Sequence, residues 1–306
     1  MATNTPAQPS ESPASPESKV WIDGELVPKS QALVSVYDHG LLYGDGVFEG
    51  IRAYGGRILK LATHLERMWQ SAESIRMRPP YTKDEIANAI RATIAANNLP
   101  DGYIRLVFTR GAGNLGLDPR KCPRPCAIVI VDTIQLYPAE LYRKGMRIIV
   151  TKRPRIPVEC LDPSIKSLNY LNNILAKLEA VDADVFEAIM LNTDGYVAEC
   201  TGDNIFGVKG NTVYTPPVEA GLLNGVTRRY VMQEIAPALG YEVRERMMRL
   251  DDLLAMDEIF LTGTAAEIIG VSGVGDRTIG AGETGPVTAA IAAEFRRRMA
   301  AGAPED

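Results

Sequence analysis

The chain has 306 residues, of which 46% are hydrophobic, and this is long enough for one large domain or two ordinary ones. Its 33 basic and 38 acidic residues give a net charge of −5 without long runs of one sign, which argues against nucleic acid or an anionic membrane as a partner. No apolar stretch approaches the roughly 20 residues that a membrane-spanning helix needs.

Cysteine and histidine are scarce, and this limits the available chemistry. A three-histidine metal site needs more histidines than the two available, and an HExxH zinc helix would need both, so we expect no metal. A Ser/His/Asp triad would need one of the two. The four cysteines are irregularly spaced, and we predict buried free thiols. These residues are His39, His64, Cys122, Cys126, Cys160 and Cys200. Lysine, tyrosine and carboxylates, or a cofactor, must then do the proton transfers.

Residues 1–19 are rich in Pro, Ser and Glu, a composition that predicts a disordered tail. They lack the basic start and the apolar core of a secretion signal, so we expect a cytoplasmic protein.

Residues 20–133 read as a small α+β domain. The stretch "VWIDGELVP" predicts two strands joined by an Asp-Gly turn, and "GYIRLVFTRG" and "CAIVIVDTI" predict two more. Between them, "THLERMWQSAESI" predicts a helix that begins with a capping box from Thr63 to Glu66, and a second helix is expected over about 83–97.

Residues 134–145 read as a connector, and residues 146–306 as a larger cofactor-binding domain. This part opens with a strand, "MRIIVTK", and continues into a meander with turns at Asp194-Gly195 and Gly210-Asn211. Helices are expected around 168–180, 226–239 and 284–299. The predicted fold class is therefore α/β or mixed α+β, in two domains.

Lys166, in "SIKSLNYLNN", is a candidate nucleophile because its flanking residues are compatible with partial burial, which favours the neutral amine. Tyr170 follows four positions later. It shares a helix face with Lys166 if a helix has begun by then, and lies about one turn away if the helix begins at Ser167. Glu199 lies within a predicted strand, where its carboxylate needs a partner if it is buried. Taken singly, a surface lysine, a core tyrosine and a solvated strand acid remain the simpler interpretations.

Two stretches of small residues could bind anions. In "NGVTRRYV" the amides of Val226 and Thr227 begin a helix, and in "LTGTAAEI" a strand ends in residues 262–266. In the first domain Arg67 points away from the apolar stripe of its helix. Tyr103 and Arg105 share one face of a strand, where they could meet a carboxylate.

Together, an amine, a phenol, an acid and two anion-binding turns match what pyridoxal phosphate requires. The chain resembles the fold-type IV pyridoxal-phosphate enzymes, and within them the branched-chain amino-acid aminotransferases, from about Val20 to the last helix. The motifs that carry the resemblance are "YDHGLLYGDGVFEGIR", "HLERM", "YIR", "IKSLNYLNN", "GYVAECTGDNIF", "LLNGVTRRYV" and "GTAAEI", in the order of the family.

The resemblance implies a small α+β domain and a larger domain with a meander or barrel-like core. It also implies transamination between L-leucine, L-isoleucine or L-valine and 2-oxoglutarate through a pyridoxal-phosphate Schiff base on Lys166, and a homo-oligomer that is at least a dimer. Cofactor contacts would come from Arg67, Tyr170, Glu199, Val226, Thr227 and Thr264, and substrate contacts from Tyr43, Phe48, Tyr103, Arg105, Thr264 and Ala265.

Two related activities stay open, because D-amino-acid aminotransferases and aminodeoxychorismate lyases share the fold, the lysine and the acid. "FEGIR", "YIR" and "GTAAE" favour the branched-chain enzyme. The loop "TRGAGNLGLDPRKCPRP" departs from the tighter loop of typical enterobacterial members, and loops of this kind border the active site in the superfamily.

Overall fold

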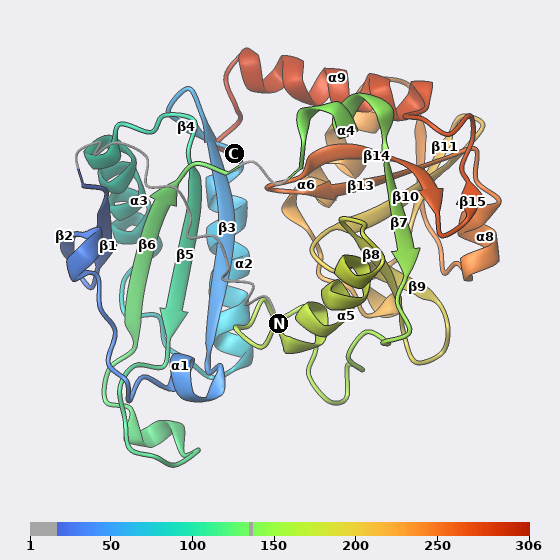
Figure 1. The fold of residues 1–306 in the computed structure, drawn as a ribbon. Coiled ribbons are helices and arrows are strands. Elements are labelled where there is room, and N and C mark those ends of the chain that lie inside the picture. Colours follow the sequence, from blue (N-terminus) through green and yellow to red (C-terminus); the bar gives the residue numbers. More distant parts are fainter. Residues whose placement is uncertain (1–16, 135–136) are drawn as a thin grey trace, which may run out of the picture.

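The computed structural model describes residues 17–134 and 137–306, so most of the predicted tail lies outside the described residues. Two β-sheets, formed by successive parts of the chain, lie side by side (Figure 1). The sheets confirm the mixed α+β class. The first strand begins at Lys19, and none of the described helices is long and apolar enough to cross a membrane.

The first sheet has six antiparallel strands in the order β2-β1-β6-β5-β3-β4. The Asp23-Gly24 turn is confirmed, and both residues have positive φ, as a tight hairpin turn requires. The strands are β1 (Lys19–Ile22), β2 (Glu25–Pro28), β3 (Gly46–Tyr54), β4 (Arg57–Ile58), β5 (Tyr103–Thr109) and β6 (Cys126–Asp132). Short helices are η1 (Lys29–Gln31), α1 (His39–Tyr43) and η2 (Pro119–Lys121).

Two helices, α2 (Leu61–Ser74) and α3 (Lys83–Asn97), bury their apolar faces against this sheet. Leu65, Met68 and Ala72 of α2 enter the core at the spacing that the sequence predicts. A capping box does occur, but it belongs to α3, where Thr82 and Glu85 exchange hydrogen bonds.

The capping box predicted at Thr63 is wrong. Helix α2 begins two residues earlier, after Lys60, which has positive φ and provides no side-chain cap. The chain's last residues replace the cap: the carbonyl of Glu305 accepts from the Ala62 N–H, and the Asp306 carboxylate accepts from the N–H and hydroxyl of Thr63. The signal was local, whereas the cap comes from more than 240 residues away in sequence.

The connector contains a helix, α4 (Ala139–Lys144), and its residues 135–136 lie outside the described residues. The second sheet has nine strands in the order β12-β11-β10-β13-β14-β7-β8-β9, with β15 paired to β14. The four strands predicted as a meander are present, but they form two hairpins, β8-β9 and β10-β11, because β10 pairs with β13 and not with β9. The strands are β7 (Met146–Val150), β8 (Ala188–Leu191), β9 (Val197–Cys200), β10 (Asn204–Lys209), β11 (Thr212–Thr215), β12 (Glu242–Glu245), β13 (Glu258–Gly263), β14 (Glu267–Val274) and β15 (Arg277–Thr278).

The helices of the second part are α5 (Leu171–Asp182), η3 (Val218–Ala220), α6 (Val226–Tyr230), α7 (Ala236–Ala238), α8 (Leu250–Leu254) and α9 (Pro286–Ala300). A π-helical stretch, η4 (Val231–Ile235), joins α6 to α7 just before Pro237, which has no N–H to continue the helical pattern. Two apolar cores result. One contains the stacked rings of Phe206 and Phe260, 4.8 Å apart, and receives Phe295 from α9. The other contains Ile189 and Val271.

The four cysteines are free thiols, but the prediction that they are buried holds only for Cys200. Cys122 and Cys126 are partly buried, and Cys160 is exposed because it lies in a surface turn after Pro157. Within the described ranges, no three His, Cys, Asp or Glu side chains are grouped so that they could hold a metal.

Candidate active site

A cavity of about 550 Å³ receives side chains from the first sheet, from α2 and from the second part of the chain. Its lining includes every predicted site residue except Tyr43. These are Phe48, Arg67, Tyr103, Arg105, Lys166, Tyr170, Glu199, Val226, Thr227, Thr264 and Ala265. The set comes from several stretches that are distant in sequence, so the fold itself assembles the site.

Lys166 reaches the cavity because its backbone is attached to the first sheet. The Lys166 carbonyl accepts from the Phe48 N–H at 2.9 Å, and its own N–H donates to the Ser71 hydroxyl at 3.2 Å. The Leu168 N–H donates to the Gly46 carbonyl, so residues 166–168 pair alongside the edge of β3. The lysine segment belongs to the second part of the chain but is fixed by the first.

The amine of Lys166 lies 3.1 Å from the Tyr170 hydroxyl and 4.6 Å from the centre of the Phe48 ring. Helix α5 begins only at Leu171, later than both alternatives that the sequence left open. The two side chains therefore meet across a non-helical turn. Tyr170 is itself oriented by an edge-to-face contact with Phe48, with ring centres 5.0 Å apart.

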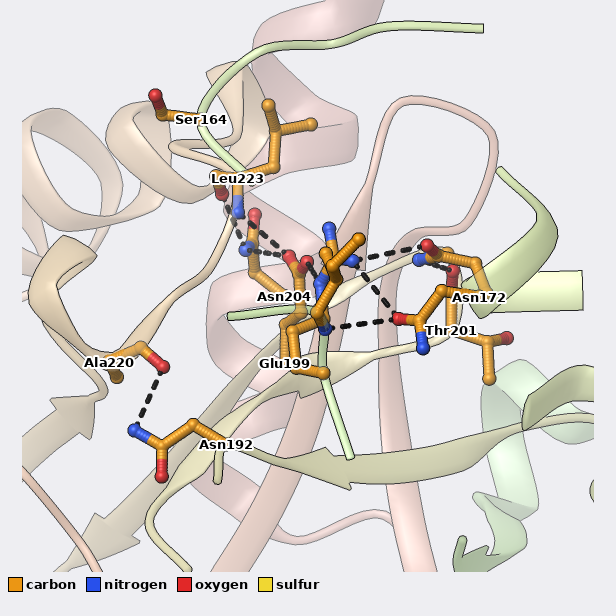
Figure 2. Close-up of polar contacts among 12 residues, drawn as sticks. Ser164, Asn172, Asn192, Glu199, Thr201, Asn204, Ala220 and Leu223 are labelled. Atoms are coloured by element: carbon orange, nitrogen blue, oxygen red, sulfur yellow. Dashed lines mark hydrogen bonds and ion pairs between the residues drawn. The ribbon is translucent and has the colours of Figure 1, made fainter. Parts of the chain in front are cut away.

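Glu199 is 5% exposed, so the simpler interpretation of a solvated strand acid is wrong. Figure 2 shows hydrogen bonds that converge on its carboxylate. Oε2 accepts from Asn204 Nδ2 at 3.3 Å and from the Leu223 N–H at 3.1 Å, and Oε1 accepts from Arg155 Nε at 2.7 Å. Burial raises the pKa of Glu199, and the Arg155 guanidinium opposes this rise.

Arg67 is buried together with Glu49 and His64. Its Nε and Nη2 bind the two Glu49 oxygens at 2.7 and 2.8 Å, and Nη1 donates to the Asn224 carbonyl at 2.9 Å. Burial would raise the pKa of Glu49, but Arg67 and His64 outweigh burial and hold that pKa well below its usual range. One N–H on each terminal nitrogen of Arg67 remains for an anion in the cavity.

Helix α2 therefore has two buried faces. Its apolar face packs on the first sheet, while His64, Arg67 and Ser71 form a second buried stripe at helical spacing. The sequence showed that Arg67 leaves the apolar stripe, but not that this second stripe is covered by the other part of the chain.

Both predicted anion-binding turns line the cavity. Helix α6 starts at Val226 after Gly225 without a side-chain cap. In the second stretch, Thr262 and Gly263 end β13, and residues 264–266 form the turn that joins β13 to β14. The buried Thr262 hydroxyl has no hydrogen-bond partner in the described part of the chain, as expected of a group that serves a ligand.

Tyr103 and Arg105 are neighbours, as their spacing on β5 predicts, with Arg105 Nη2 3.3 Å from the Tyr103 hydroxyl. The Arg105 guanidinium also lies 4.5 Å from the Phe48 ring centre. Gly50, opposite on β3, leaves the space that Tyr103 needs, because a Cβ there would lie 2.1 Å from the phenol oxygen.

Tyr43 does not line the cavity of its own chain. It is 37% exposed at the end of α1, where its ring contacts His39. The predicted role of Tyr43 as a wall of this cavity therefore has no support within one chain.

Sequence reasoning missed a group of buried acids and a buried arginine. Glu187 and Asp203 line the cavity together with Tyr137, whose hydroxyl donates to Asp203 at 2.9 Å. Burial, and then Glu187, raise the pKa of Asp203 to about 7. Glu49 and Glu187 stand in or beside strongly apolar stretches, a signal that could have identified them. Arg155, between two prolines, offers no such signal.

Comparison with known proteins agrees with this geometry. The sequence pattern of the family described as Amino-transferase class IV matches residues 46–274. A Methanocaldococcus jannaschii protein, named "Putative branched-chain-amino-acid aminotransferase", is 46% identical to this chain. The match covers 91% of this chain and 95% of that protein. The D-alanine aminotransferase of Bacillus licheniformis is 34% identical, over 93% of its length and 88% of this chain.

A solved structure of the T.th. branched-chain amino acid aminotransferase, complexed with N-(5′-phosphopyridoxyl)-L-glutamate, superposes with a TM-score of 0.88. It is 36% identical, and the match covers 94% of this chain and 96% of that one. The family match includes the cavity-lining lysine, acid and anion-binding turns. This chain belongs to the class IV aminotransferases.

Proposed function

We propose that this protein is a pyridoxal-phosphate-dependent transaminase that moves an amino group between L-leucine, L-isoleucine or L-valine and 2-oxoglutarate. The observation that carries the proposal is the Lys166 amine, which faces a cavity together with a phenol at 3.1 Å, a buried carboxylate and a guanidinium. The M. jannaschii relative and the T.th. structure support the branched-chain substrates.

The residues around the cavity fit pyridoxal phosphate. Lys166 would hold the cofactor through its amine, Tyr170 would donate to its 3-oxygen, and Glu199 would accept from its ring nitrogen. The phosphate would meet Arg67, the first amides of α6 at Val226 and Thr227, and Thr264. The Thr262 hydroxyl, which has no hydrogen-bond partner among the described residues, and Arg67 lie on this same lining.

When bound, pyridoxal phosphate supplies an electron sink for the electrons left behind when the substrate's Cα proton is removed. The protein's own residues do the rest. Lys166, once released by the substrate, would accept and return that proton, and Tyr170 would orient the amine. Glu199, as an anion, would keep the ring nitrogen protonated.

The substrate end of the cavity suits both an aliphatic side chain and a distal carboxylate. Tyr103 and the Thr264-Ala265 backbone would take the α-carboxylate, and Arg105 the distal carboxylate of glutamate. When leucine is bound, Arg105 still has the Phe48 face at 4.5 Å and the Tyr103 oxygen at 3.3 Å. These contacts lower the cost of leaving the guanidinium without an anion.

Transfer from D-amino acids is the second candidate, favoured by the B. licheniformis relative, which is 34% identical and is named a D-alanine aminotransferase. The cavity residues shared between the two activities are the cofactor contacts. Substrate choice thus has to be measured with both enantiomers.

The protein would also work as an oligomer of at least two chains, with the segment around α1 as the contact. Large apolar side chains are exposed there and on a neighbouring loop: Leu33, Val36, Leu41, Leu115 and Leu117 are 63–78% exposed. The two segments are held together by hydrogen bonds from Gly113 to Tyr37 and between His39 and Asn114. Exposed apolar surface of this extent marks a contact with another chain.

The test is the absorbance spectrum of the purified protein with pyridoxal phosphate, before and after L-leucine and then 2-oxoglutarate. We expect a cofactor band that depends on the lysine, shifts with L-leucine, returns with 2-oxoglutarate and is absent from Lys166→Ala. A lysine-dependent band that responds to D-alanine but not to L-leucine would replace the branched-chain proposal with the D-amino-acid one.

A further inference from the structure

Arg155 is buried, with 7% of its surface exposed, and it does not line the cavity. Its Nε binds Glu199 Oε1 at 2.7 Å from the side opposite to Asn204 and Leu223. Arg155 therefore acts on the cavity through the residues it contacts, of which Glu199 and Asn173 belong to the lining.

The guanidinium is fixed at its other end by the first turn of α5. Nη1 lies 3.2 Å from Asn173 Oδ1 and 3.4 Å from Asn172 Oδ1. Asn172 also holds the backbone on both sides of Arg155, because it accepts from the Ile156 N–H and donates to the Pro154 carbonyl. Asn173 donates in turn to the Thr201 carbonyl. Arg155 thus links the Glu199 strand to the helix that follows Tyr170.

A carboxylate this deeply buried needs a cation to stay ionised. Burial raises the pKa of Glu199, whereas Arg155, the Leu223 N–H and Lys166 lower it, with Arg155 the strongest of the three. Two further charged groups near Glu199 are Arg67, whose guanidinium is paired with Glu49, and Asp203. Asp203 is an acid, so it cannot replace the guanidinium. Lys166 is committed to the cofactor in the proposed function.

We propose that Arg155 is a positioning residue that keeps Glu199 ionised and aimed at the ring nitrogen of pyridoxal phosphate, while its contacts with Asn172 and Asn173 keep Glu199 in register with Lys166 and Tyr170. The inference deepens the proposed function and rests on it. The role is electrostatic as well as geometric, so it predicts an effect of pH that a purely structural residue would not produce.

The experiment compares the wild type, Arg155→Gln and the matched control Arg153→Gln, whose arginine is exposed two residues away. Without the cation, Glu199 keeps its proton to higher pH, so the acid limb of the kcat profile should move to higher pH. We expect Arg155→Gln to lower kcat about tenfold or more at pH 6 and less than about threefold at pH 9, and Arg153→Gln to follow the wild type.

A second readout needs no turnover. In infrared difference spectra of the apoprotein, variant minus wild type, Arg155→Gln should show additional carboxylic-acid C=O absorbance that persists to higher pH. This additional absorbance should be missing from Arg155→Gln/Glu199→Gln, which also leaves no unpaired buried charge. The kcat of this double variant should be no lower than the kcat of Glu199→Gln, because Arg155 acts through Glu199.

A kcat loss that is equal at every pH, an unmoved carboxyl band, or losses that multiply in the double variant would overturn the inference. If Arg155→Gln does not fold, Arg155→Lys keeps the charge but loses the planar fork, and a smaller shift of the same sign is expected. In that variant, a kcat loss that is equal at every pH would overturn the inference. A wild type without a lysine-dependent cofactor band would instead refute the proposed function, so the two failures are distinguishable.

Discussion

At the scale of single residues, the site depends on side chains that satisfy one another before any ligand binds. Arg105 is the clearest case, because its guanidinium lies between the Phe48 ring and the Tyr103 hydroxyl. A cation that already contacts an aromatic face and a neutral oxygen can bind a substrate carboxylate. When that carboxylate is absent, the same two contacts still stabilise the cation. This arrangement would let one cavity accept the two unlike substrates of the proposed reaction.

Arg105→Gln should therefore separate the two half-reactions. We expect kcat/KM for 2-oxoglutarate to fall about 100-fold, because a charge-assisted contact is lost, and kcat/KM for L-leucine to change by less than about threefold. Steady-state kinetics with each substrate measure both values, with Arg78→Gln, an exposed arginine, as the control. Equal losses for leucine and 2-oxoglutarate would contradict the assignment.

At the scale of elements, α2 shows how a helix can be set by distant parts of the chain. Glu305 and Asp306 cap its first turn, and its apolar face packs against the first sheet. On its polar face, Arg67 donates to the Asn224 carbonyl. Ser71 on the same helix binds the backbone of Lys166. A displaced α2 would carry with it Arg67, the arginine proposed to bind the phosphate.

Removing the distant cap should loosen α2. Asp306→Ala is expected to lower the free energy of unfolding by about 0.5–2 kcal/mol, the usual cost of losing an N-terminal cap. Urea unfolding of the apoprotein measures this loss. Glu283→Ala, which removes an exposed acid from a surface turn far from α2 in sequence, serves as the control. An unchanged urea midpoint for Asp306→Ala would show that Asp306 contributes nothing as a cap.

At the scale of the whole molecule, the two sheets leave the cavity between them and expose an apolar surface around α1. Tyr43 belongs to that surface and not to the cavity of its own chain. Its predicted substrate role is compatible with the structure only if α1 of one chain approaches the cavity of another.

Self-association should then depend on this surface. We expect the wild type to sediment as a dimer or larger assembly, and Leu41→Glu/Leu117→Glu to sediment as a monomer, because two charges would have to be buried in the contact. Leu239→Glu, 38% exposed on another element, is the matched control and should leave the assembly intact. A monomeric wild type at micromolar concentration would refute the proposal.

The sequence alone determined the strands of the hairpins β8-β9 and β10-β11, the Asp23-Gly24 turn, the helix at residues 83–97 and the lysine, tyrosine and acid of the candidate site. These follow from local signals: alternation of side chains, turn residues and the few groups able to do the chemistry. Only the tertiary structure decided what those groups contact. Arg155 meets Glu199 across 44 positions, and Asp306 meets Thr63 across 243. Such contacts leave no local pattern, because burial and charge pairing depend on which segments the fold brings together.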